Sequence, residues 1–258
     1  ESAFPLKRQK AMIKTIFEHR SVRSYKPDPV DEALLQRILE AGTRASNTGN
    51  MQIYSIIVTT DPQIREQLSP CHFGQPMVTQ APIVLTFCVD VRRFSLWCRQ
   101  RGADPQYDNF VWFVNGAIDA ILASQNVCLE AESEGLGICY LGTTTYNADR
   151  IAEVLALPEG VIPVTTVTMG YPDKLPPTDR LPLEGVIHRE RYHDYTPEAI
   201  DAIWADKEAS EETAGLLQAN DLPNLARIFT ERRYKGEDNR LFSRKYFEML
   251  KKQGFFNQ

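Results

Sequence analysis

The chain has 258 residues, of which 43% are hydrophobic and 24% are charged, and its formal net charge is -5. This composition supports a sizeable hydrophobic core, and the acidic balance argues against a protein that binds nucleic acid nonspecifically. No apolar run approaches the roughly 20 residues of a membrane-spanning helix, and the polar opening ESAFPLKRQK does not resemble a signal peptide.

The first half of the chain contains both predicted helices and predicted strands. Apolar residues at helical spacing, or a capping residue before them, mark each helix, and β-branched or continuous apolar runs mark each strand. The predicted helices are 11–19, a second helix capped by Asp31, and a third that begins at Asp61–Pro62. The predicted strands are 54–60 and 81–90.

A long helix is predicted over residues 109–134. Its apolar residues form a broad face that suggests a central helix, namely Phe110, Val114, Ile118, Ile121, Leu122 and Leu129. Short or buried strands follow at 135–142 and 161–172, then an irregular loop at 173–193, and the pattern is helical and charged from Pro197 onward.

Strands mixed with long helices, without strict alternation of the two, predict a single α+β domain. Within it we expect a core of residues 1–195 and a helical C-terminal extension of residues 196–258.

Cysteine and histidine usage indicates neither disulfides nor a metal site. The five cysteines are an odd number and contain no CxxC motif, which favours a reducing, cytoplasmic location and structural roles. His188 and His193 stand five residues apart with no cysteine nearby, so no metal site is predicted.

The segment EHRSVRSY carries two arginines, Arg20 and Arg23, directly after the first predicted helix. Arginine is well suited to grip a carboxylate or phosphate. A helix C-terminus repels anions, so the side chains themselves would have to hold one. The alternative is that both arginines are surface charges paired with Glu18 or Asp28.

Two further segments are compatible with ligand binding. RASNTGNMQ, 44–52, offers amides and hydroxyls that suit a flat heterocycle, or it is simply a polar turn. GLGICYLGT, 135–143, follows a helix and lacks the spacing of a dinucleotide-binding fingerprint. Its glycines cap the helix or allow a ligand to approach the backbone closely.

Taken in order, the segments HRSVRSY, EAGTRASNTGNMQ, GQPMVTQAP, AESEGLGICYLG, LPEGVIPVTTVTMGYP and RLPLEGVIHRERY resemble the FMN-dependent nitroreductase family. The resemblance covers roughly residues 12–195. The ending MLKKQGFF is similar to that of the longer, NADPH-preferring branch, which includes the flavin reductase of luminous bacteria and the major oxygen-insensitive bacterial nitroreductase.

The resemblance implies a nitroreductase-like fold, with a central, mostly antiparallel sheet flanked by helices, in an interlocked homodimer wrapped by the extension. It implies binding of FMN by His19, Arg20, Ser21, Arg23, Ser46, Asn47, Thr48, Asn50, Gln75, Tyr140, Leu141, Gly142, Thr143 and Arg180. Of these, Arg20, Ser21 and Arg180 match the phosphate end, and Arg23 matches the N1/O2 edge of the ring.

This chain departs from the family pattern at two places. Where the branch often reads Lys-Pro-Arg, this chain has Thr178, Asp179 and Arg180, so one cation is lost and an acid is added; Lys174 is a possible substitute. Where the branch often has two glycines, it has Gly142 and Thr143, which adds a side chain near N5 of the flavin.

The implied activity is two-electron, ping-pong transfer from NADPH or NADH to a small-molecule acceptor such as a nitroaromatic compound, a quinone or a flavin. No acid–base constellation is present, and the flavin carries the chemistry. The alternatives are a flavin-binding or redox-sensing protein without efficient turnover, and a structural domain with no cofactor. A homodimer has independent support, because the five consecutive apolar residues 110–114 cover every side of a helix.

Overall fold

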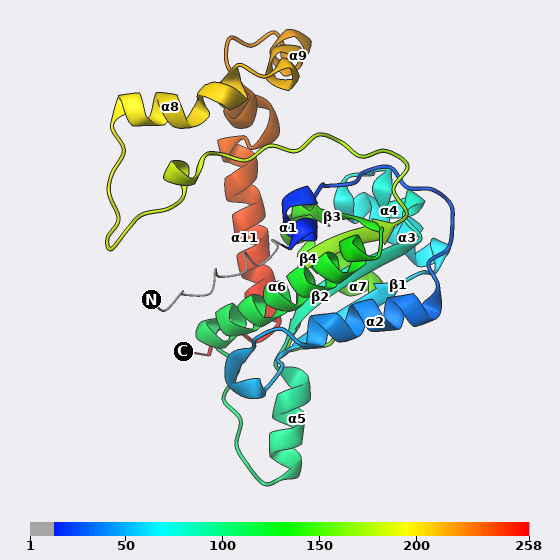
Figure 1. The fold of residues 1–258 in the computed structure, drawn as a ribbon. Helices are drawn as coiled ribbons and strands as arrows, with labels where there is room; N and C mark the ends of the chain where they lie inside the picture. The colour runs from blue at the N-terminus through cyan, green and yellow to red at the C-terminus, as the bar shows by residue number, and fades with distance from the viewer. Residues whose placement is uncertain (1–12, 258) are drawn as a thin grey trace, which may run out of the picture. The chain divides into compact units, whose positions relative to one another are not determined.

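The computed structural model describes residues 13–257 and confirms the predicted α+β class (Figure 1). The chain divides into two units: the first ends at Pro176 and resumes at Lys245, and the second is Pro177–Arg244. Helix α11 (Gly236–Lys252) begins in the second unit and ends in the first. The division expected at residue 195 falls inside the second unit and stays a prediction.

The first unit is built on a sheet of four antiparallel strands, as far as the described residues show. The strand order is β1-β2-β4-β3, so that β2 and β4 are central and β3 lies at an edge. The strands are β1 (Tyr54–Thr59), β2 (Ile83–Asp90), β3 (Gly137–Leu141) and β4 (Val161–Gly170). The four strands predicted from the sequence and their mostly antiparallel pairing are confirmed.

Helices cover both faces of this sheet, which explains why every residue of β2 is buried. On one face, Leu85 and Phe87 pack with α2 (Glu32–Thr43) and α6 (Phe110–Ser133). On the other face, Val84 packs with α3 (Pro62–Leu68), α4 (Met77–Gln80) and α7 (Ala148–Val154). The alternation of neighbouring strand residues between faces follows from the period of a β-strand.

Small residues let α6 lie close to its neighbours. A Cβ atom added to Gly116 would lie 2.6 Å from Val89 Cγ1, and one added to Gly42 of α2 would lie 2.5 Å from Val127 Cγ2. The helix is confirmed, but the apolar residues that suggested a central position do not form its buried face. Five of them are exposed instead, namely Phe110, Val114, Ile118, Ile121 and Leu122.

Three helices were not predicted, namely α4, α5 (Arg92–Gln100) and α7. None has a side-chain hydrogen bond at its N-cap. The N-cap residues of α4 and α5, Pro76 and Val91, give no capping signal, whereas Asn147 of α7 is a preferred capping residue whose side chain donates to Cys71 O instead. By contrast, the Asp31 carboxylate accepts from Leu34 N, as predicted for the start of α2. The first predicted helix is shorter than expected, α1 (Lys14–Glu18), and residues 11 and 12 lie outside the described residues.

The second unit is helical, which confirms the pattern read from Pro197 onward. Its helices begin with side-chain caps from Thr196, Ser210 and Asn224. Its elements are the short turn η4 (Leu183–Gly185), α8 (Pro197–Glu208), α9 (Glu211–Asn220), α10 (Leu225–Ile228), the π-helical turn η5 (Phe229–Arg233) and the first part of α11. Among the described residues of the whole chain, no helix is both long and apolar enough to span a membrane.

Candidate functional site

The arginine-bearing segment runs along the free edge of β3. Ser21 forms a parallel bridge with Ile138, and Val22 N donates to Ile138 O at 2.8 Å. Four residues later Tyr25 forms a second bridge, to Pro172. The Arg23 guanidinium acts to lower the pKa of the Cys139 thiol, although burial raises that pKa more strongly. The backbone therefore brings residues 19–23 beside the strand that leads into residues 140–143.

Glu132, near the end of α6, holds the start of this segment. His19 Nδ1 lies 2.8 Å from Glu132 Oε1, and Arg20 N donates to the same oxygen at 3.4 Å. Arg20 Nη1 donates to the carbonyl oxygen of Pro176 at 2.7 Å. These contacts anchor the backbone and the side chain of Arg20 without neutralising its charge with an ion pair.

Within residues 13–257, neither Arg20 nor Arg23 forms an ion pair with a carboxylate. Glu18, one of the two carboxylates considered as a partner, pairs with Lys14 at 3.2 Å instead. Arg23 is exposed, and its guanidinium makes one weak contact, Nη1 to Ser21 O at 3.5 Å. The interpretation of these arginines as paired surface charges therefore has no support in the structure.

A cavity of about 560 Å³ adjoins Arg20. Its charged lining residues are Lys14, Glu18, Arg20 and Glu132, so acids and bases are mixed. Of the predicted binding residues, Arg20 is the one that lines this cavity. The cavity by itself therefore does not represent the predicted site.

The polar loop 44–52 is fixed to the middle of α6 by a buried acid. The Asp119 side chain is 1% exposed, and its Oδ1 accepts from Thr48 N at 2.8 Å and from Thr48 Oγ1 at 3.1 Å. Asn47 is tied within the loop, because its Oδ1 accepts from Gln52 N at 3.2 Å. The side chains of Ser46 and Asn50 are exposed and available to a ligand.

Two of the predicted groups are well separated within one chain. Thr48 contacts Asp119, whereas His19 and Arg20 contact Glu132, thirteen residues further along α6. At 1.5 Å per residue this places the two contacts about 20 Å apart along the helix. The two groups are therefore anchored at different points of α6, one at its middle and one near its end.

The segment 140–143 differs in exposure from one residue to the next. The Tyr140 hydroxyl lies 2.8 Å from Ser124 Oγ, and burial raises the pKa of this phenol, so it stays protonated. Leu141 is almost completely buried, with 2% of its surface exposed. At Gly142, by contrast, an added Cβ would meet no atom within 4 Å.

Thr143, the residue that replaces a glycine of the family pattern, contacts a buried histidine. Its Oγ1 lies 2.8 Å from His72 Nδ1. His72 ends the turn η2 (Ser69–His72), and Thr143 lies in the turn η3 (Gly142–Tyr146). Gln75 belongs to the same region, since its backbone N–H donates to His72 O at 3.2 Å. Gln75 and Thr143 therefore both contact His72, Gln75 through its backbone and Thr143 through its side chain.

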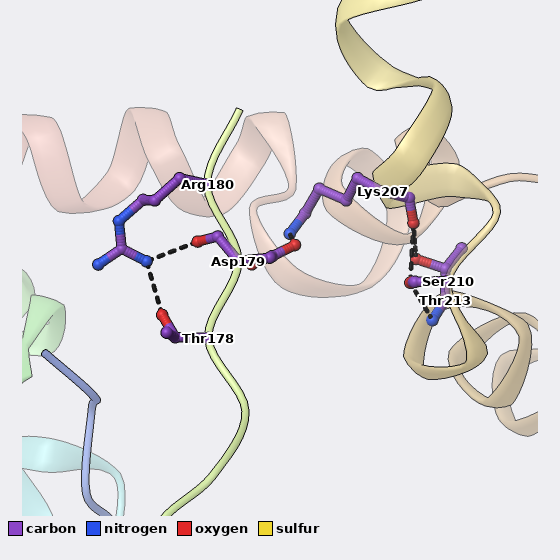
Figure 2. A network of polar contacts seen from close by, with 6 residues as sticks. All are labelled: Thr178, Asp179, Arg180, Lys207, Ser210 and Thr213. Atoms are coloured by element: carbon purple, nitrogen blue, oxygen red, sulfur yellow. Dashed lines mark hydrogen bonds and ion pairs between the residues drawn. The ribbon is translucent and has the colours of Figure 1, made fainter. Parts of the chain in front are cut away.

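Arg180 lies in the second unit, in a local network shown in Figure 2. Its Nη1 donates to Thr178 Oγ1 at 2.9 Å and to Asp179 O at 2.6 Å. The Asp179 carboxylate does not pair with Arg180; it accepts from Lys207 Nζ at 2.6 Å. This hydrogen bond lowers the pKa of Asp179. The acid that this chain adds beside Arg180 is therefore balanced by a lysine of α8.

The comparison with protein families identifies the family of this chain. The Nitroreductase family model matches residues 16–171, well over half of the chain. The chain belongs to the nitroreductase family. The prediction made from the sequence is confirmed, and so is the predicted class of enzyme, an oxidoreductase.

Individual nitroreductase relatives agree with this. The FMN reductase (NADPH) of Bacillus subtilis is 34% identical over 184 residues, which are 70% of this chain and 74% of that protein. A crystal structure of a Bacteroides fragilis protein matches with a TM-score of 0.93 at 47% identity, covering 95% of this chain and 100% of the other. The NADPH:FMN oxidoreductase from Vibrio harveyi, solved with NAD+, matches with a TM-score of 0.78 at 28% identity, covering 95% and 99%.

The residues of this nitroreductase fit the predicted FMN in chemistry. Arg20, Arg23 and Arg180 form no ion pairs among the described residues, so each guanidinium can meet a phosphate or an electron-rich ring edge. Ser46 and Asn50 offer exposed polar groups. The open space at Gly142 leaves room for a ligand against the backbone.

Sequence reasoning missed four residues that position these groups. Two of them, Asp119 and Glu132, are acids on α6, and Asp119 had a usable signal because it is a lone charge within an apolar helical run. His72 and Lys207 had no local signal. Their partners, Thr143 and Asp179, lie 71 and 28 residues away along the chain.

The five cysteines are free and buried. Burial raises the pKa of the Cys128 thiol to about 12, so the reactive thiolate is not formed at neutral pH. No group of three or more His, Cys, Asp or Glu side chains suited to a metal ion occurs in the part of the chain that the structure describes.

Proposed function

We propose that this protein is an FMN-dependent oxidoreductase that takes electrons from NADPH, or from NADH, and passes them to a small-molecule acceptor. The observation that carries the proposal is the set of arginines without ion pairs, Arg20, Arg23 and Arg180, at the predicted positions of an acidic nitroreductase. The names of two relatives, which include FMN and NADPH, support the choice of cofactor and co-substrate.

Each residue of the predicted set has a proposed role. Arg20, Ser21 and Arg180 hold the phosphate, with His19 fixing the backbone through Glu132. The remaining residues contact the ring and the ribityl chain, namely Arg23, Ser46, Asn47, Thr48, Asn50, Gln75, Tyr140, Leu141, Gly142 and Thr143. Bound FMN would supply the redox chemistry, accepting a hydride and later passing two electrons to the second substrate.

The protein's own contribution is binding and electrostatics. Arg23 is exposed and carries a full positive charge, so it can stabilise the negative charge that reduction places on the N1/O2 edge. No side-chain base is assigned, because hydride transfer from a dihydronicotinamide requires none. The acceptors we propose are nitroaromatic compounds, quinones and flavins.

The two half-reactions should be separable in the purified protein. Under argon, NADPH is expected to bleach the yellow enzyme, and to do so faster than NADH does. After removal of the nucleotide, adding a quinone or a nitroaromatic compound should restore the yellow colour, because ping-pong transfer needs no ternary complex. Rapid-scanning absorbance spectroscopy measures both steps.

The outcomes of this experiment separate the possible functions. A yellow protein that NAD(P)H does not bleach would be a flavin-binding or redox-sensing protein without turnover. A colourless protein that takes up no added FMN would contradict the proposal altogether. A reduced enzyme that is reoxidised only while nucleotide remains bound would contradict the ping-pong sequence.

We further propose that the working unit is a homodimer with FMN at the interface. One side of α6 carries a stripe of apolar residues at helical spacing. This stripe is exposed in the single chain, although the opposite side of the helix is buried in the core. The exposed residues of this stripe are Val111, Val114, Ile118, Ile121 and Leu122, with Val111 61% exposed. A second copy of the same stripe is a suitable cover, because twofold symmetry brings identical surfaces together.

The separation along α6 supports a shared site. Because the loop at Thr48 and the segment at Arg20 are held about 20 Å apart along one helix, we infer that the loop of one subunit completes the site of the other. An obligate interface of this kind is expected to bury more than about 2,000 Å².

The Lys207–Asp179 pair should sustain FMN affinity. Replacing Lys207 by methionine leaves the Asp179 carboxylate without its partner beside Arg180. Because the pair is partly exposed and screened by solvent, we expect FMN binding to weaken only about twofold to fivefold. Fluorescence titration of FMN at two salt concentrations measures the change.

A second substitution and a control make this prediction specific. Adding Asp179→Asn to Lys207→Met should restore the affinity, because the uncompensated charge is then removed. Lys251→Met breaks a comparable exposed pair with Glu248 in the first unit and should have no effect. Equal FMN affinity in the Lys207→Met variant and the unmodified protein would refute the proposed balance of charge.

A further inference from the structure

The contact between Thr143 and His72 has no role in the function proposed above. The His72 side chain is completely buried, and its Nδ1 lies 2.8 Å from Thr143 Oγ1. Its other ring nitrogen, Nε2, is buried and has no hydrogen-bond partner among the described residues. Thr143 itself is half-buried and stands directly after Gly142, where the backbone is open.

The charge state of His72 limits what this contact can be. Burial lowers the pKa of His72 to about 4, so the ring is neutral at pH 7 and carries one N–H. If that proton is on Nε2, a buried donor is left without an acceptor. If it is on Nδ1, it is donated to Thr143 Oγ1 and only a bare acceptor remains at Nε2. Buried donors without partners are rarer in folded proteins than buried acceptors without partners, which favours the proton on Nδ1.

The tautomer of His72 decides what the threonine can offer. An oxygen that accepts from Nδ1–H cannot also donate its own proton to that nitrogen. Thr143 Oγ1 has no other partner among residues 13–257, and the side chain is half-buried rather than enclosed. Its O–H proton is therefore free to donate toward the accessible side, where Gly142 leaves open space.

We propose that His72 positions Thr143 as a hydrogen-bond donor to a carbonyl oxygen of the bound flavin ring, and that this pair raises the reduction potential of the flavin. The inference rests on the proposed function, because it places Thr143 beside FMN. The carbonyl oxygens of the ring gain electron density on reduction, so a donor to one of them stabilises the reduced form more than the oxidised form. N5 is not such an acceptor, because reduction converts it to an N–H donor. The two-glycine pattern of the family lacks this side chain.

Removal of the hydroxyl tests the donor. Thr143→Val should weaken the binding of reduced FMN relative to oxidised FMN by about threefold to tenfold, which is a fall of about 14–30 mV for a two-electron couple. Thr143→Ser keeps the hydroxyl and should keep the potential. The matched control is Thr145→Val, since Thr145 is a half-buried threonine of the same turn whose side chain has no hydrogen bond among the described residues. Dye-equilibrated reduction of the purified flavoprotein measures the potential.

Two substitutions test the positioning residue. His72→Leu removes the Nδ1–H group that is donated to Thr143 Oγ1, and it should lower the reduction potential as Thr143→Val does. His72→Asn places an amide N–H near the position of Nδ1–H and should retain most of the potential. The tautomer is measured directly by ¹⁵N chemical shifts of the histidine rings, of which the chain has four, and His72→Asn identifies the signal.

The results distinguish this inference from the function on which it depends. A protein that binds no FMN contradicts the proposed function, whereas the ¹⁵N measurement still reports on His72. A proton on Nε2, or a potential unchanged in Thr143→Val, overturns the inference while FMN binding stands. A proton on Nδ1, with a lower potential in Thr143→Val and His72→Leu but not in Thr145→Val, supports it.

Discussion

Replacing Arg20 by alanine is expected to weaken FMN binding about tenfold to a hundredfold. The guanidinium is half-buried, is held at the Pro176 carbonyl oxygen, and forms no ion pair among the described residues, so its charge is available to the phosphate. A hydrogen bond to a charged group contributes about 1.5–3 kcal/mol, which corresponds to that range of affinity. Quenching of FMN fluorescence on titration with apoprotein measures it.

Three variants make the result specific. Arg180→Ala should weaken binding in the same way, because Arg180 is proposed to hold the same phosphate. Arg20→Lys should recover part of the affinity, since the charge remains but the planar fork of donors is lost. Arg37→Ala removes an exposed arginine that pairs with Glu134 and is not in the predicted site, so it should have no effect.

The unfolding temperature of Arg20→Ala must be measured alongside the affinity. Arg20 also bonds the Pro176 carbonyl oxygen, and a partly unfolded variant would lose FMN for that reason alone. FMN affinity that stays the same in both Arg20→Ala and Arg180→Ala would show that these residues do not hold the phosphate.

Charges placed on the apolar stripe of α6 should break the proposed dimer. Ile118 and Ile121 are 50% and 51% exposed in the single chain, so glutamates there are accommodated in a monomer. In a twofold interface the same carboxylates would be desolvated without partners, at a cost of at least about 4 kcal/mol. The dimer dissociation constant of Ile118→Glu/Ile121→Glu should therefore rise about a thousandfold.

Sedimentation velocity at micromolar concentration, together with FMN content, measures the effect. The control is Leu96→Glu/Trp97→Glu, a pair of exposed apolar residues on α5 of the same unit. This control should remain dimeric and yellow. A double variant of α6 that is monomeric but retains FMN and activity would refute the shared site, and one that stays dimeric would place the interface elsewhere.

Local signals in the sequence were sufficient for much of the fold. The Asp31 cap predicted the start of α2, and the apolar run in residues 81–90 predicted the buried strand β2. Both features depend on neighbouring residues only, through a cap hydrogen bond and through the period of a strand. Where the local signal was missing, as at the start of α5, whose N-cap residue is Val91, the prediction missed the helix.

Apolar content alone could not say which surface α6 buries. Ile118 and Ile121 have the composition of core residues, yet the helix packs on the sheet through Gly116 and Ala120. A core and an interface between subunits are both apolar, so the pattern is the same for each. The choice depends on how closely the helix can approach the sheet, and here Gly116 lies directly against Val89.

The sequence by itself determined the family, the α+β class, and the arginines and polar loop proposed to hold FMN, because these depend on residue types in a recognisable order. Only the tertiary structure decided which side chains hydrogen-bond to these binding residues and their neighbours and hold them in place. Glu132 meets His19 across 113 residues, Asp119 meets Thr48 across 71, and Lys207 meets Asp179 across 28. A hydrogen bond requires its two atoms to be about 3 Å apart, and distance along the chain says nothing about distance in space once the chain has folded.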